Sequence, residues 1–290
     1  MVPSGVRAFV LAPIFYIVAL ALAIVIIANA NDASRAYESA SAHETVSAKT
    51  DRALRETLES LSLGFYGGGT ELAEQHADAI GVARFHEARA TGAGWLLLGF
   101  SLAFLAIIVA AEEHGGRRSS IAIIRHLFGV SGIFLLVGLL APILTVVAHE
   151  DIALLGRIVL QYESKGIITT IHKLYLVGNY FLALLLLLFS VLLPVLKIVL
   201  SLLALELRHS RLRRTSVVLM KAIGRWSMTD VFVVAVLLAF LTADTAQLTD
   251  ATLGAGLYFF AGYGLLSIAA GHMMVGYEEK LLPPSVAEGQ

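Results

Sequence analysis

The chain of 290 residues contains no cysteine and few charged residues, and both shortages restrict what it can be. Without cysteine it has no disulfide, thiolate nucleophile, iron–sulfur cluster or cysteine-ligated zinc site. Charged residues make up 15% and hydrophobic residues 58%, whereas globular domains have about 25% and about 45–50%. The apolar residues gather in blocks long enough to cross a bilayer, so the composition predicts an integral membrane protein. A net charge of −1 gives no overall attraction to nucleic acid, and no nucleic-acid partner is expected.

Catalytic motifs are also absent from the sequence. It has no glycine-rich phosphate loop, no Gly-x-Ser-x-Gly turn and no His-Glu-x-x-His pair. The nine histidines are scattered, and none forms an i, i+4 pair that would suit a metal. We therefore expect no enzymatic activity, no catalytic residue, no bound metal and no cofactor.

Six apolar blocks predict an all-α, polytopic membrane bundle of six transmembrane helices. The blocks cover residues 6–28, 94–111, about 127–148, 177–205, 226–243 and 253–275. The fifth has only 13 strongly apolar residues, 231–243, and must include residues 226–230 to approach the roughly 20 residues that a span needs. Nine basic residues lie in the loops after spans two and four, against three in the short loops on the other side. By the positive-inside rule, both termini are expected in the cytoplasm.

The spans divide the chain into two parts and a short tail. Residues 1–111 form a predicted transmembrane hairpin, residues 126–275 a four-helix membrane domain, and residues 276–290 a cytoplasmic tail. The first block is too long for a signal-peptide core, so we expect it to be a retained anchor.

Residues 29–92 are polar, yet their apolar residues recur at helical spacing, which predicts a long periplasmic helical hairpin that continues the first two spans outward. Two interpretations remain open for this region. It is either a spacer that packs on itself, or a stalk that docks a partner protein or a second copy of the chain.

Polar residues inside the apolar blocks are the candidates for a functional site, because charge in a bilayer is costly. Lys197 lies within the fourth span, and Asp230 enters the fifth span from the same side at comparable depth. Contact between them would lower the cost of burying each charge. The alternative is two separate interfacial residues, a snorkelling lysine and an aspartate at a helix N-terminus. Pro194 interrupts the fourth span, and Ser190, one turn earlier, could satisfy a freed backbone group.

Two segments carry a resemblance to a known family. Residues 190–197 read Ser-Val-Leu-Leu-Pro-Val-Leu-Lys, and residues 226–232 read Trp-Ser-Met-Thr-Asp-Val-Phe after a basic loop. Together with the glycine-rich sixth span, these segments resemble the paraquat-inducible protein A family over residues 134–271. The chain looks like a single-repeat member without the cysteine-rich zinc ribbons of better-known relatives.

The resemblance implies a multi-pass protein of the bacterial inner membrane, in an envelope-homeostasis or lipid-trafficking system. Membrane lipids and a periplasmic lipid carrier with a mammalian-cell-entry (MCE) domain are the implied partners. The polar transport site would comprise Lys197 and Asp230, with Ser227, Ser190 and Pro194 shaping it and Trp226 in the motif. The alternative function is a non-transporting scaffold or stress sensor that dimerises, or docks partners, through the periplasmic hairpin.

Overall fold

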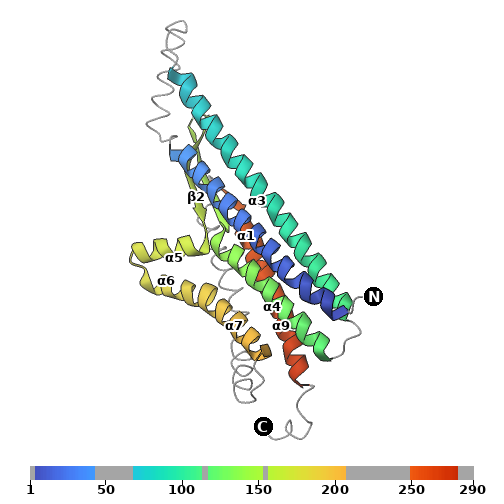
Figure 1. The fold of residues 1–290 in the computed structure, drawn as a ribbon. Helices are drawn as coiled ribbons and strands as arrows, with labels where there is room; N and C mark the ends of the chain where they lie inside the picture. Colours follow the sequence, from blue (N-terminus) through green and yellow to red (C-terminus); the bar gives the residue numbers. More distant parts are fainter. Residues whose placement is uncertain (1–3, 43–67, 113–116, 153–155, 207–248, 280–290) are drawn as a thin grey trace.

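The computed structural model describes residues 4–42, 68–112, 117–152, 156–206 and 249–279 (Figure 1). In chain order its elements are α1 (Ser4–Ala42), α3 (Gly68–Glu112), α4 (Arg117–Leu140), β1 (Leu144–Ile152), β2 (Gly156–Lys165), α5 (Ile167–Leu176), α6 (Tyr180–Leu186), the π-helix η1 (Leu187–Leu192), α7 (Leu193–Glu206), β3 (Thr249–Leu253) and α9 (Ala255–Glu279).

The helices α1 and α3 form a long antiparallel pair (Figure 1). Their 39 and 45 residues correspond to about 58 and 68 Å of helix at 1.5 Å per residue. Small side chains such as Ala19, Ala23 and Ala90 are buried, which lets long helices approach closely. A bilayer core is about 30 Å thick, so both helices extend well beyond the length of a span. The described residues therefore contain two helices that continue the first two predicted spans. The connection between them, residues 43–67, lies outside the described residues, so the periplasmic hairpin stays a prediction.

The helix α4 lies at the centre of the described bundle, where it contacts α1, α3, α7 and α9. Its closest neighbour is α9, which runs antiparallel to it. A Cβ atom at Gly138 would come within 2.8 Å of the backbone of Phe260, and one at Gly262 within 2.8 Å of the Phe134 ring. Glycine at these positions brings the two helices into direct contact, as in other membrane bundles.

A three-stranded antiparallel sheet, with strand order β2–β1–β3, closes one end of the bundle. We call this the sheet end; the opposite end carries the start of α1 and the end of α9 (Figure 1). In the register of the sheet, Leu144 of β1 pairs with Lys165 of β2 and Leu253 of β3. The prediction of an all-α bundle describes the membrane helices and did not include this sheet.

The third span was predicted to end at residue 148, and this boundary is wrong. The helix α4 ends at Leu140 and β1 begins at Leu144. Pro142 lies between them and explains the change, because proline lacks the N–H group that a helix needs and disfavours helical geometry in the residue before it. The apolar residues that follow are largely β-branched, and such residues favour strands.

The fourth predicted span, residues 177–205, begins slightly later in the structure. It consists of α6, η1 and α7, from Tyr180 to Glu206, after a turn in which Gly178 has a φ of +86°. The separate helix α5 precedes this turn and meets α6 at a sharp angle (Figure 1). The turn therefore reverses the chain between a short helix beside the sheet and the span itself.

Five of the described helices are long and apolar enough to cross a membrane. They contain the segments Leu11–Ser39, Asp78–Ala111, Ser120–Leu140, Tyr180–Glu206 and Ala255–Gly276. The predicted span at 226–243 lies outside the described residues, so the total of six stays a prediction. The chain is a multi-pass membrane protein with a predominantly helical fold.

Candidate polar site in the membrane bundle

Few polar side chains are buried in the described part of the bundle. They are five serines and one lysine, namely Ser101, Ser131, Ser190, Lys197, Ser201 and Ser267. A polar group in a low-dielectric interior has a strong influence on its local environment. These six residues are the structural candidates for a polar site.

Lys197 lies on α7 with only 5% of its surface exposed. The adjacent Ile198 reaches α4 beside Gly132, where a Cβ would lie 4.0 Å from its Cδ1 atom. One turn further along α7, the buried Ser201 donates a hydrogen bond of 2.6 Å from Oγ to the Lys197 carbonyl oxygen. A lysine inside a membrane helix is expensive and marks functional regions. The protein therefore encloses the predicted site lysine.

Ser190 and Pro194 lie together at the irregular part of the fourth span. Ser190 is 1% exposed within the π-helix η1, and the buried Pro194 occupies the first turn of α7. In a regular α-helix, residue 194 would donate its N–H group to the carbonyl of residue 190, but proline has no such group. At the end of η1, the backbone N–H of Leu193 instead donates to the carbonyl of Leu188, five residues earlier. The proline thus accounts for the wide turn that carries Ser190, and π-turns of this kind often accompany functional sites.

Three predicted site residues, Trp226, Ser227 and Asp230, lie outside the described residues. The proposed contact between Lys197 and Asp230 therefore stays a prediction. The structure brings Lys197, Ser190 and Pro194 into one span and buries all three.

The other four buried serines were missed by the sequence reasoning. Ser101, Ser131, Ser201 and Ser267 lie on α3, α4, α7 and α9 respectively. Each occupies the inward-facing stripe of its helix, as Ser101 does between Leu97 and Phe104. A serine on such a stripe was the available signal, but only Ser190, one turn before a proline, and Ser227, in the family motif, had been considered.

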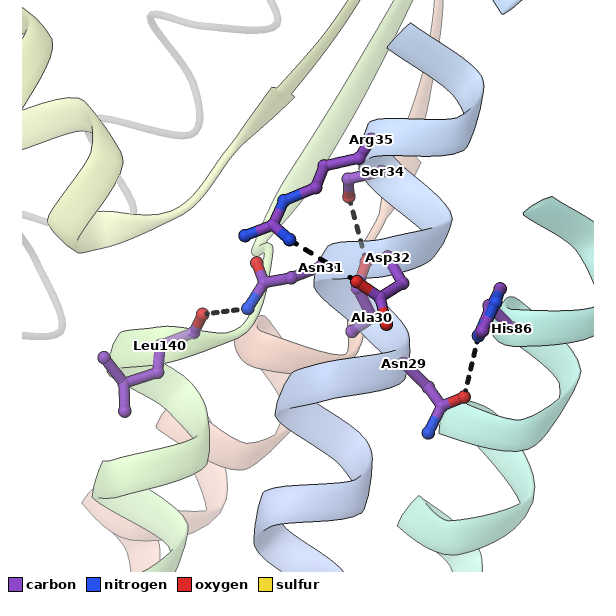
Figure 2. Close-up of polar contacts among 8 residues, drawn as sticks. All are labelled: Asn29, Ala30, Asn31, Asp32, Ser34, Arg35, His86 and Leu140. Atoms are coloured by element: carbon purple, nitrogen blue, oxygen red, sulfur yellow. Dashed lines mark hydrogen bonds and ion pairs between the residues drawn. The ribbon is translucent and has the colours of Figure 1, made fainter. Parts of the chain in front are cut away.

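At the sheet end, the hairpin is fastened to the remainder of the bundle by polar contacts from α1 (Figure 2). The Asn31 side chain donates from Nδ2 to the carbonyl oxygen of Leu140, 3.2 Å away, at the last residue of α4. Helix ends leave such carbonyls without a helical partner, so Asn31 acts as a cap supplied by another helix. Ser34 exchanges a hydrogen bond of 2.9 Å with Ser164 of β2.

The same turn of α1 also binds α3. The Asn29 Oδ1 atom lies 2.9 Å from Nδ1 of His86 (Figure 2). Further along α1, Tyr37 donates from its hydroxyl group to Glu87 Oε2 over 3.0 Å. The sheet end therefore joins α1, α3, α4 and β2 through hydrogen bonds.

The opposite end of the bundle has a mixed aromatic and polar contact. The Tyr16 hydroxyl lies 3.1 Å from Nδ1 of His126 on α4. Phe15 stacks on Phe104 of α3 with ring centroids 3.8 Å apart. Nearby, Arg125 forms an ion pair of 3.0 Å with Glu206 of α7, and both side chains are largely exposed. Within the described ranges, no group of three histidine, cysteine, aspartate or glutamate side chains could hold a metal ion.

Comparison with known protein families finds a match to part of this bundle. Residues 130–275, just over half of the chain, match paraquat-inducible protein A. The chain belongs to the paraquat-inducible protein A family. The resemblance seen in the motif residues is thereby confirmed, and the match extends a few residues further at each end. No curated protein and no solved structure matches the chain.

The family match divides the structure into two regions. We call residues 130–275 the family unit; it includes the second half of α4 from residue 130, the sheet, α5 to α7 and most of α9. Lys197, Ser190 and Pro194 all fall within it, as do Ser131, Ser201 and Ser267. The long pair α1 and α3, which we call the hairpin, lies outside the match and contributes Ser101.

Proposed function

We propose that the chain is an inner-membrane subunit of an envelope-homeostasis or lipid-trafficking system in bacteria. The buried Lys197 within the family unit is the single observation that carries the proposal. A lysine held inside a membrane bundle is a typical device for moving protons or for recognising anionic groups. Phospholipids carry such groups on their headgroups. The proposal assigns the chain no catalytic reaction.

The proposed polar site joins Lys197 with Asp230, with Ser190 and Ser227 as hydrogen-bonding neighbours and Trp226 beside them. An aspartate close to Lys197 would offset the cost of burying the ammonium group. Pro194 supports the site by holding the wide turn at Ser190. This arrangement gives the fourth and fifth spans a shared polar face.

We further propose that both termini are cytoplasmic and that the sheet end is periplasmic. This orientation follows from the basic loops through the positive-inside rule. The hairpin would then extend from the membrane into the periplasm, where its partner would be a lipid-binding protein of the MCE type. A single repeat offers less enclosed volume than two, so assembly with a partner, or with a second copy of the chain, forms part of the proposal.

The test is to purify the full chain from its native membrane in mild detergent. Mass spectrometry of the sample should then identify bound phospholipid and a periplasmic lipid-binding protein. A parallel preparation of the Lys197→Met variant should retain less lipid at equal protein recovery. Isolation of the wild-type chain with neither lipid nor partner would contradict the proposal.

The hairpin favours a second candidate function, that of a scaffold or stress sensor without transport. Its helices extend well beyond a span and pack along each other, which gives a stalk for docking or dimerisation. Replacing residues 43–67 with a short glycine–serine linker separates the two functions. A sensor or scaffold should lose its cellular effect, while lipid retained by the family unit should be unchanged.

A further inference from the structure

Among the residues that the structure describes, two buried hydroxyl groups in the bundle have no hydrogen-bond partner. They are the Oγ atoms of Ser101 on α3 and Ser267 on α9. The residues are 2% and 1% exposed, so lipid and bulk water do not reach them. An unpaired buried hydroxyl is costly, and nearly all such groups in folded proteins are bonded to protein or to ordered water.

The contacts of α4 place Ser101 at a defined depth. The Phe104 ring of α3 lies beside that of His126 on α4, with centroids 5.2 Å apart. Because α3 and α4 run in opposite directions (Figure 1), the residue three positions before Phe104 lies near the level of residues 129–130 of α4. Ser101 occupies that position.

The contacts between α4 and α9 give the depth of Ser267. Gly138 lies against Phe260, and Phe134 lies against Gly262, so residue numbers fall along α4 as they rise along α9. Ser267 lies five residues after Gly262 on α9. The same antiparallel register therefore places Ser267 at about the level of Ser131 on α4. The two unpaired hydroxyls therefore flank the same turn of α4, one from the hairpin and one from the family unit.

Ser131 supplies a third polar group at this depth. It is 0% exposed and donates from Oγ to the carbonyl oxygen of Phe128 over 2.8 Å. Its lone pairs remain able to accept a hydrogen bond. Residues three or four positions apart lie on the same face of a helix, so Ser131 shares a face of α4 with Phe134 and Gly138. Phe134 and Gly138 contact α9. Ser131 therefore lies on the α9 side of α4. Three hydroxyls from three helices thus occur within about one helical turn of depth.

We propose that Ser101, Ser131 and Ser267 form a binding site for ordered water in the interior of the bundle, shared between the hairpin and the family unit. A buried water typically makes about three hydrogen bonds, which matches the number of hydroxyls. Ser101 and Ser267 would donate to it or accept from it, and Ser131 would accept. This site does not depend on the proposed lipid function. Its consequence is that the hairpin is a component of the polar interior and not only an anchor.

Thermal unfolding of Ser101→Ala, Ser267→Ala and the double variant in detergent tests the shared site. If the hydroxyls share a water, each single variant lowers the midpoint, and the double variant lowers it by less than the sum. If the hydroxyls are dry and unpaired, their removal raises the midpoint. A raised midpoint, or strictly additive losses, would overturn the shared site.

Discussion

Some glycines of the family unit lie in tight contact with a neighbouring element, whereas the described glycines of the hairpin have room for a Cβ atom. In the family unit, a Cβ at Gly138, Gly256 or Gly262 would come within 2.8 Å of atoms on a neighbouring element. In the hairpin, a Cβ at Gly92 or Gly99 would meet nothing within 4 Å. The family unit therefore depends on backbones in direct contact, whereas α3 does not need these glycines for packing within the described chain.

The two regions also differ in what they bury. Among the described residues, the family unit encloses a charged side chain and four of the five buried serines, whereas the hairpin buries mainly alanine, with some isoleucine and phenylalanine. On the proposals above, the family unit would contain the polar transport site, while the hairpin would support it and contribute Ser101 to the water site. The following predictions test that division, from the largest expected effect to the smallest.

Loss of the buried lysine is expected to have the largest effect. Lys197→Met keeps the length and the apolar stem of the side chain but removes its charge, so we expect cellular activity to fall at least tenfold. Lys173→Met is the control, since Lys173 is exposed on α5 of the same family unit. The measurement is complementation of a deletion strain under envelope stress, with membrane protein levels checked by immunoblot. Full complementation by Lys197→Met at normal levels would show that the family unit does not require the charge.

Replacing a glycine by alanine should change the stability of the protein differently in the two regions. Gly138→Ala forces α4 away from the Phe260 backbone, where no side chain can move aside, and overpacking of this kind costs about 1–3 kcal/mol. Gly99→Ala on α3 meets open space, and alanine in a helix is more favourable than glycine by up to about 1 kcal/mol. The midpoint of thermal unfolding in detergent should therefore fall for the first variant and stay or rise for the second. Equal shifts would contradict the contrast between the regions.

The irregular turn before Pro194 should matter more for activity than for stability. Pro194→Ala restores a backbone donor and allows residues 187–192 to return to an α-helix, which would rotate Ser190 relative to Lys197. We expect a severalfold loss of activity in the complementation assay, with an unfolding midpoint equal to or above that of the wild type. Pro13→Ala in α1 is the control, because it removes a proline from the hairpin instead. A lower midpoint with intact activity would show that the turn serves folding alone.

The sequence predicted the structure of the hairpin and that of the family unit to different extents. In the hairpin, the long apolar blocks correspond to α1 and α3, which run without interruption through the described residues. Its connection and its side of the membrane stay predictions. In the family unit, hydropathy extended the third span through residues 144–148, because an apolar strand next to a membrane helix resembles more of that helix. Pro142 lies inside the predicted third span, but the helix ends before it.

The candidate site was predicted in part for a related physical reason. A lysine in an apolar block is conspicuous, and Lys197 proved to be buried. A serine is small and common in membrane helices, so Ser101 or Ser267 gains meaning only when packing brings several helices to one level. That packing depends on contacts such as Gly138 with Phe260, which no local pattern in the sequence encodes.

The smallest expected effect concerns the attachment between the two regions. Asn31→Ala removes the side chain that caps the carbonyl of Leu140 at the sheet end (Figure 2), and a hydrogen bond of this kind contributes about 0.5–1.5 kcal/mol. Asp32→Ala is the matched control on the next residue. It breaks an exposed ion pair with Arg35, 3.5 Å long, and such pairs within a helix contribute about 0.3–0.5 kcal/mol. The unfolding midpoint in detergent should fall more for Asn31→Ala, because only this substitution loosens α1 from α4. An equal or larger loss for Asp32→Ala would mean that the hairpin is held to the family unit by its apolar packing, with the polar junction adding little.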